Sequence, residues 1–152
     1  MSRHVASVEW VRGDQTFADN RYSRAHDCTF DGGAVVRASA APTRVAVLLS
    51  DPAAVDPEEA FVAALSSCHM LFFLAFAAKA GLIVDRDRDD AVGELGTDDR
   101  WRTSMTVVTL CPVVDFTGQT PEMAALDELH HRAHAGCYIA NSVRTEVRIE
   151  PR

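Results

Sequence analysis

The fold of this chain is decided by its most apolar stretch, residues 56–70, which reads DPEEAFVAALSSCHM. Asp56 is a good N-cap, Pro57 suits the first helical position, and acidic residues next to them stabilise the positive end of the helix dipole. Apolar residues continue as far as Gly81, a residue that commonly stops a helix. We therefore predict one long helix over residues 57–80. Because it is apolar nearly all round, it should be buried on most sides, within the fold or against a second copy of the chain.

Strands are predicted on both sides of this helix, and a second helix follows them. Residues 4–11 alternate between polar and apolar types, which predicts a strand. The turn Asp31-Gly32-Gly33 is expected to join the two strands of a hairpin. Residues 45–49 suit either a strand or a loop. The remaining predicted elements are strands over 82–84, 91–95, 101–114 and 143–149, and a helix over 120–135. Strands and helices do not alternate regularly, so the order predicts an α+β fold in a single domain, residues 1–152. The charge run of residues 85–90 is expected at a solvated strand edge or turn.

The composition narrows the possible partners and the compartment. The chain of 152 residues is 47% hydrophobic and carries 22 acidic against 15 basic residues, a net charge of −7, which disfavours binding to nucleic acids and anionic membranes. Residues 1–10 do not resemble a leader peptide, so a cytoplasmic protein with reduced cysteines is expected. Residues 57–80 are long enough to span a bilayer, but Ser66, Ser67 and His69 interrupt their centre, and no membrane span is expected.

Cys68 lies half-way along the predicted helix, far from either end. The helix dipole therefore cannot lower the pKa of its thiol, and a reactive Cys68 needs a cation beside it. Arg21 and Arg24, just before the glycine turn, are candidates for that cation. Glu58 or Glu59 would supply the carboxylate that holds a partly buried arginine in place. Taken alone, a cysteine in such a setting is more often a small core residue.

Two cysteine segments give the chain a specific resemblance. The first is residues 56–69, DPEEAFVAALSSCH, and the second is residues 135–142, AGCYIANS. In their order and separation they resemble the two cysteine motifs of the OsmC/Ohr family, and residues 22–26 with residues 30–33 match its OsmC-like branch. The resemblance covers almost the whole chain. It implies an OsmC-like fold, with antiparallel sheets around long central helices in an intertwined homodimer.

The resemblance also implies an activity. Members of the family are thiol-dependent peroxidases that protect against oxidative stress by reducing organic hydroperoxides, and a dithiol, in one branch a lipoylated protein, re-reduces them. No cofactor or metal is expected. By position, Cys68 is expected as the peroxidatic cysteine, Cys137 as the resolving cysteine, Glu58 as the carboxylate, and Arg24, which lies nearer the turn than Arg21, as the activating arginine. Candidates for an apolar substrate pocket are Phe61, Met70, Phe72 and Phe73.

The spacing of Glu58 and Cys68 adds a geometric expectation. Ten residues along one helix correspond to a rise of about 15 Å and to different helix faces. A glutamate cannot reach that thiol within one straight helix. Either a long arginine bridges the two residues, or Glu58 of one subunit serves Cys68 of the other.

Two alternative functions compete with the peroxidase. His130, His131, His134 and Cys137 cluster in the sequence, and the spacing of His130 and His134 is that of a metal-binding pair on a helix. The chain could also be a catalytically silent dimer of the same fold that binds a hydrophobic ligand. Cys28 and Cys111 belong to no motif and are expected to be structural.

Overall fold

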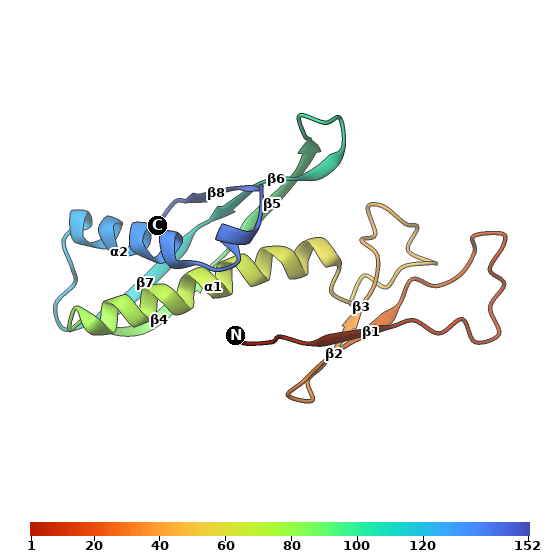
Figure 1. The fold of residues 1–152 in the computed structure, drawn as a ribbon, viewed down its shortest axis with the longest axis horizontal. Helices are drawn as coiled ribbons and strands as arrows, with labels where there is room; N and C mark the ends of the chain where they lie inside the picture. The colour runs from red at the N-terminus through yellow and green to blue at the C-terminus, as the bar shows by residue number, and fades with distance from the viewer. The chain divides into compact units, whose positions relative to one another are not determined.

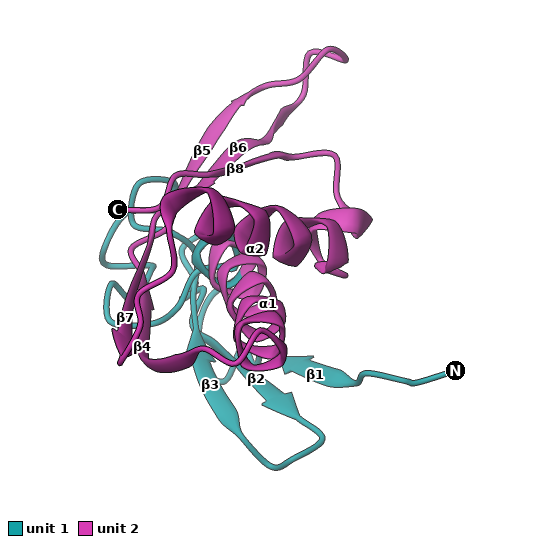
Figure 2. Ribbon diagram, turned by 90° about the vertical axis from the view of Figure 1, so that its left-hand side faces the viewer, with its two compact units in different colours: residues 1–60 teal, residues 61–152 magenta.

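The computed structural model describes all residues 1–152 and confirms the α+β class. The chain forms two compact units, residues 1–60 and residues 61–152 (Figure 2). Each unit has its own sheets, and the long helix α1, Pro57–Lys79, begins in the first unit and continues through the second.

The first unit is an antiparallel sheet of three strands in the order β1-β2-β3 (Figure 1). Its strands are β1 (Ala6–Glu9), β2 (His26–Phe30) and β3 (Val35–Ala38). The glycine turn joins β2 to β3 as predicted, with Gly33 at φ 85°, a value that favours glycine. In the register of the sheet, Cys28 lies opposite Val8 and Val36, which agrees with a structural role for this cysteine.

Helix α1 begins where the sequence predicts and ends one residue earlier. The Glu59 backbone N–H donates to Asp56 Oδ1 at 2.8 Å, and the Asp56 N–H donates to Glu59 Oε2 at 3.1 Å. These two bonds form a capping box that fixes the first turn. The helix ends at Lys79, and Gly81 follows it at φ 77°.

The second unit places α1 beside α2 (Met123–Gly136) and beside two sheets (Figure 1). One sheet pairs β4 (Ile83–Asp89) with β7 (Pro112–Thr117), and the helices contribute to a shared core with it. That core consists of Phe73, Ala77, Leu129 and Ala133, with partly buried residues of β4 and β7 packed against it. The helices are thus held against each other by apolar contacts.

The other sheet of this unit has the order β5-β6-β8. Its strands are β5 (Val92–Thr97), β6 (Thr103–Leu110) and β8 (Glu146–Ile149), and β8 follows the short 3₁₀ helix η1 (Ala140–Ser142). The β5–β6 pair is antiparallel, whereas β6 and β8 run parallel. Leu65 of α1 packs on Val108 and Leu110 of β6, so this sheet supports the middle of α1.

The predicted strand over residues 101–114 is in fact two strands, because the ladder is interrupted at Cys111. The Cys111 N–H donates to Asp89 Oδ1 at 2.6 Å, and Pro112 has no N–H to donate. The chain therefore leaves the sheet of β6 and enters the sheet of β7 at this point. Cys111 itself is buried, in agreement with a structural role.

Most of the charge run lies in β4, an edge strand of its two-stranded sheet, as the first of the two expected settings requires, but two of its aspartates are not solvated. Asp89 accepts the Cys111 N–H and a 2.6 Å hydrogen bond from the Ser66 hydroxyl of α1. Both carboxylate oxygens of Asp87 are buried without a hydrogen-bond partner. The alternation of the strand turns these two aspartates to the same side, away from the exposed arginines between and beside them.

Two smaller differences concern loops. Residues 45–49 form turns rather than a strand. Helix α2 starts at Met123, three residues later than predicted, because Glu122 is still extended at ψ 152° while its carbonyl accepts the Leu126 N–H.

Of the helices, α1 alone is long and apolar enough to cross a membrane, judged by the length and composition of its most apolar window. The core helix of a globular fold meets the same criteria. Only 22% of that window is buried, so much of the apolar surface of α1 is exposed.

Candidate functional site

The candidate site forms where α1 meets the segment that follows α2. Cys68 lies in the middle of α1 and is half-buried, whereas Cys137 follows the last residue of α2 and is 1% exposed. Both cysteines are free thiols. Burial, and after it the neighbouring Cys68 thiol, raise the pKa of Cys137, while hydrogen bonds from the backbone N–H groups of Ala140 and Ile139 lower it. The fold thus brings together two thiols that lie about seventy positions apart in the sequence.

The Ala140 contact shows how η1 holds the second thiol. Its N–H donates to Cys137 Sγ at 3.3 Å, and the Asn141 N–H donates to the Cys137 carbonyl. A hydrogen bond to sulfur stabilises the thiolate, but the net shift of the pKa of Cys137 is upward, so Cys137 is protonated at neutral pH.

Gly136 lets the end of α2 approach α1 closely. A Cβ atom at this position would lie 3.0 and 3.1 Å from two ring carbons of Phe72. On its other side, the Phe72 ring meets the ring of Tyr138 edge-on, with centroids 5.1 Å apart. Residues on both sides of Cys137 are therefore packed against the turn of α1 that follows Cys68.

Gly136→Ala is therefore expected to separate the two thiols. Alanine has the higher helix propensity, so a loss of stability would report the crowding of Phe72 rather than a backbone effect. We expect a loss of about 1–3 kcal/mol in urea unfolding and slower disulfide formation between Cys68 and Cys137. Gly32→Ala is the control, since a Cβ there meets nothing within 4 Å. Unchanged stability and unchanged disulfide formation in Gly136→Ala would contradict the expectation.

Two histidines lie buried beside the thiols, on the same two helices. His69 of α1 is 2% exposed and His130 of α2 is 3% exposed, and the distance between His69 Nε2 and His130 Nδ1 is 3.1 Å. Burial, then the proximity of His130 and His134, lower the pKa of His69 to about 4. Burial also lowers the pKa of His130, against the opposite effects of Asp127 and Asp89. The pair is therefore uncharged at neutral pH.

These shifts predict a specific acid sensitivity. His69 contributes stability that is present above its unfolded pKa of 6.5 and is lost as the pH falls towards 4, a loss of up to about 3 kcal/mol. Asp87 has the opposite effect, because burial and Asp89 raise its pKa from 3.8 to about 6. The stability that Asp87 contributes is fully present below pH 3.8, its unfolded pKa, and is lost as the pH rises through about 6, its folded pKa.

We therefore expect Asp87→Asn to lose more stability than the wild type between pH 7 and pH 4.5. The substitution removes the titration that offsets His69, and it leaves the histidines in place. Urea unfolding at a series of pH values measures the difference, with Asp85→Asn on the exposed side of β4 as the control. Parallel stability curves for Asp87→Asn and the wild type would show that Asp87 does not offset the histidines.

The two glutamates at the start of α1 have different positions. Glu59 is engaged in the capping box with Asp56, whereas Glu58 is half-buried and forms no hydrogen bond or ion pair. Of the two, Glu58 is therefore the one whose carboxylate has no partner in the chain.

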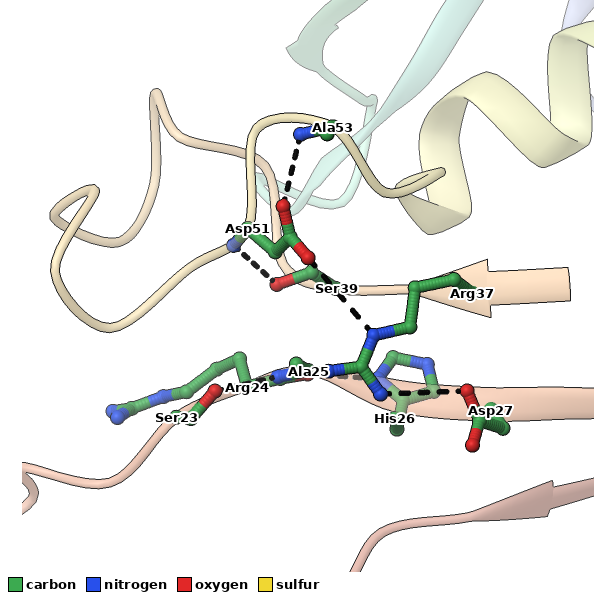
Figure 3. Close-up of polar contacts among 9 residues, drawn as sticks. All are labelled: Ser23, Arg24, Ala25, His26, Asp27, Arg37, Ser39, Asp51 and Ala53. Atoms are coloured by element: carbon green, nitrogen blue, oxygen red, sulfur yellow. Dashed lines mark hydrogen bonds and ion pairs between the residues drawn. The ribbon is translucent and has the colours of Figure 1, made fainter.

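Arg24 lies in the first unit and has no carboxylate partner. Its guanidinium donates to Asn20 Oδ1 at 2.7 Å and to the backbone carbonyls of Asn20 and Tyr22, and it lies 3.8 Å from the centre of the Tyr22 ring. Figure 3 shows the contrast with Arg37, whose guanidinium points towards two aspartates while that of Arg24 points away from them. Arg37 lies 3.4 Å from Asp27 and 3.9 Å from Asp51. Arg21, the other candidate, forms no ion pair either, so both arginines lack a carboxylate partner.

Of the predicted site residues, Cys68 and Cys137 lie together in the second unit, and Glu58 and Arg24 belong to the first. Of the predicted pocket residues, Phe73 is fully buried in the core. Phe61 lines a cavity of about 630 Å³, whose other walls come from residues near Asp98, Met105 and Arg144. Near the thiols, the exposed apolar side chains are Leu71 and Tyr138. Sequence reasoning missed the histidine pair, because nothing in the sequence links residues 69 and 130.

The alternative of a metal site is not supported. No group of three or more histidine, cysteine, aspartate or glutamate side chains gathers to hold a metal ion. His130 contacts His69 and Cys137 lies beside Cys68, so these two members of the proposed cluster are directed to different partners.

Comparison with known proteins identifies the family and the fold of the chain. The profile of a family described as "OsmC-like protein" matches residues 50–152. A structure of an OsmC-like protein of unknown function from Vibrio cholerae is similar over 100% of both chains, with 53% identity and a TM-score of 0.98. No protein with a curated description matches the chain in sequence.

Two more distant structures share the fold. An organic hydroperoxide resistance protein from Legionella pneumophila is 16% identical, with a TM-score of 0.68 over 99% of this chain and 96% of its own. The organic hydroperoxide resistance protein OhrB of Bacillus subtilis is 17% identical, with a TM-score of 0.68 over 99% of this chain and 98% of its own.

Proposed function

The chain belongs to the OsmC-like protein family, and from this premise we propose that it is a thiol-dependent peroxidase that reduces organic hydroperoxides. Cys68 is the peroxidatic cysteine and Cys137 the resolving cysteine. The observation that carries the proposal is the meeting of these two thiols at the junction of α1 with the segment after α2. Two cysteines of distant sequence position, one half-buried and one fully buried, suit an attacking thiol and a thiol that attacks second.

The proposed reaction has two steps. The Cys68 thiolate attacks the terminal oxygen of the hydroperoxide, the O–O bond breaks, and the alkoxide takes up a proton and leaves as an alcohol. The sulfur, oxidised by two electrons, becomes a sulfenic acid. The Cys137 thiol then displaces the hydroxyl group, which leaves as water, and a disulfide forms. A dithiol reductant restores both thiols by exchange.

Arg24 and Glu58 activate the first thiol in this proposal. The guanidinium stabilises the Cys68 thiolate and the charge that develops on the departing alkoxide. The Glu58 carboxylate holds the guanidinium in place. The support is that each of these side chains is free of ion pairs within its own unit, so that each can still take a charged partner.

Organic rather than inorganic hydroperoxides fit the surroundings of Cys68. Leu71, one turn further along α1, is 60% exposed, and Tyr138, next to Cys137, is 72% exposed. These side chains would cover the organic group of the substrate, since exposed apolar surface gathered near a reactive group commonly marks a binding site.

A homodimer is part of the proposal. The exposed positions of α1 include the stripe Ala60, Ala64, Ser67, Leu71 and Ala75, which repeats at helical spacing. Small side chains on one face permit the close approach of another helix, and burial of this face against a second copy removes apolar surface from water. A cytoplasmic location fits the four free cysteines, because thiols stay reduced there.

Thiol counting tests the proposed function. After one equivalent of cumene hydroperoxide, the wild type should lose two free thiols per chain, and mass spectrometry should locate the disulfide between Cys68 and Cys137. Cys137→Ser should lose one thiol and accumulate a sulfenic acid that dimedone traps, because the resolving thiol is missing. A wild type that keeps all its thiols would leave a catalytically silent member of the fold as the remaining function.

A further inference from the structure

The contact between His69 and His130 is a hydrogen bond along the line of the two rings. The ring planes differ by 7° and the centroids lie 5.4 Å apart, while the facing nitrogens are 3.1 Å apart. The distance between the ring centroids is about the distance between the facing nitrogens plus the radius of each ring. The two nitrogens therefore lie on the line between the centroids, and the rings lie end to end and not face to face. One imidazole donates its N–H and the other accepts.

We propose that this hydrogen bond positions Cys137 against Cys68 and thereby sets how readily their disulfide forms. The inference deepens the proposed function, because it assigns control of the resolving step to two residues that do not touch the reacting sulfurs. His69 and His130 are positioning residues in this sense.

The bond joins the same two parts of the fold as the thiol pair. His69 is the residue after Cys68 on α1, and His130 lies seven residues before Cys137 on α2. Seven residues are two helical turns, or about 10 Å along α2. A slide of α2 along α1 would therefore displace Cys137 from Cys68 by the same amount as it displaces His130 from His69.

No other side-chain hydrogen bond links α1 to α2. Their remaining contacts are apolar, through residues such as Phe73 and Leu129, and apolar packing has little directional preference. A hydrogen bond weakens steeply when its length or angle departs from the optimum. The His69–His130 bond is therefore the directional contact between the two helices, and it adds to the close packing at Gly136 in favouring one register.

The surroundings of the bond enforce its geometry. The ring of Phe73 lies against that of His130, with centroids 4.3 Å apart and planes 19° apart, and fixes the plane of the imidazole. The outer nitrogens, His69 Nδ1 and His130 Nε2, are buried and have no hydrogen-bond partner. Each ring thus has one hydrogen-bonding partner within the protein, which is the other ring.

Disulfide formation is sensitive to such a register because its geometry is narrow. The two Cα atoms must lie within about 4.4–6.8 Å of each other and the Cβ atoms must point inwards. A displacement of one helix by a fraction of a turn takes the sulfurs out of this range.

Substitutions that imitate one imidazole nitrogen test the inference. His69 takes part in the bond through Nε2, and the side-chain amide of glutamine can occupy the position of that nitrogen. His130 takes part through Nδ1, and the side-chain amide of asparagine can occupy the position of that nitrogen. His69→Gln and His130→Asn should keep the hydrogen bond. His69→Asn and His130→Gln should lose it. His131→Gln is the matched control, because this neighbouring histidine is exposed and forms no hydrogen bond.

The readout is the equilibrium between the two thiols and the Cys68–Cys137 disulfide in dithiothreitol redox buffers, with no peroxide present. His69→Asn and His130→Gln should shift it about tenfold towards the thiols, which raises the reduction potential by about 30 mV. His69→Gln, His130→Asn and His131→Gln should keep the wild-type value. Glutamine should preserve the potential at position 69 and asparagine should preserve it at position 130. A general loss of stability would instead depend on the size of the new side chain, so the same residue type would be the better one at both positions.

Other results would overturn the inference. If His69→Asn and His130→Gln fold and have the wild-type reduction potential, the inference is wrong. If these two variants do not fold, a changed reduction potential in His69→Gln and His130→Asn contradicts the inference. A wild type that forms no Cys68–Cys137 disulfide in oxidising buffer also contradicts it. A wild type that forms the disulfide in buffer but not with hydroperoxide refutes the peroxidase and leaves the positioning role intact.

Discussion

Cys68→Ser is expected to lower the rate of hydroperoxide consumption by about a thousandfold or more, because a serine hydroxyl is scarcely ionised at neutral pH and is a weak nucleophile without a base. The half-buried sulfur of Cys68 is the atom that reacts first in the proposed cycle. With Cys68 absent, no sulfenic acid forms, and Cys137 alone, buried and with a raised pKa, should react slowly.

The measurement is the consumption of cumene hydroperoxide with dithiothreitol as reductant. Cys111→Ser and Cys28→Ser are the controls, since these cysteines lie in a strand junction and in β2, away from both motifs. Both controls should retain the wild-type rate. A Cys68→Ser protein as active as the wild type would exclude Cys68 as the peroxidatic residue.

Glu58→Ala and Cys68→Ser are expected to complement each other when they are placed on different subunits. Helix α1 is continuous from Pro57 to Lys79, so Glu58 and Cys68 of one chain are separated by a rise of about 15 Å. That distance exceeds direct contact between a carboxylate and a thiol. Either a long arginine bridges the two residues within one chain or Glu58 serves Cys68 of the partner subunit, and we propose the second arrangement.

Co-expression with two affinity tags would yield the heterodimers. A dimer of one Glu58→Ala chain and one Cys68→Ser chain has one intact site if the site is shared, and should recover about half of the wild-type rate. The reverse combination, with both substitutions on one chain and none on the other, should then be inactive.

A site built within one chain predicts the opposite pair of outcomes, so the two heterodimers together decide the question. Glu59→Ala is a matched control for Glu58→Ala: it removes the Asp56 N–H bond to the Glu59 carboxylate, keeps the N-cap bond to Asp56, and should cost about 1 kcal/mol of stability or less without a change in the rate.

The parts of the structure that the sequence predicted are those with strong local signals. The start of α1 follows from Asp56 and Pro57, its end from Gly81, and the hairpin from the turn at residues 31–33. The family and the identity of the paired cysteines follow from two segments whose residues are contiguous. Each of these signals acts over a few residues and needs no knowledge of the rest of the fold.

Other features depend on contacts between distant residues. The strand over residues 101–114 is divided because Asp89 accepts the Cys111 N–H, and the charge run lies in β4 because Asp87 and Asp89 turn towards the helices. No local pattern at Cys111 or at residues 85–90 contains this information. Polar residues at period two are equally compatible with a solvated edge.

The sequence by itself determined the helix that carries Cys68, the hairpin that follows Arg24, and the family to which the chain belongs. Only the tertiary structure decided that Gly136 lets the segment before Cys137 approach Phe72 of α1 closely, and that His69 and His130 share a hydrogen bond. The physical reason is that helix caps and turns stabilise single elements. The register between two helices is set by side chains that meet only after both helices have formed.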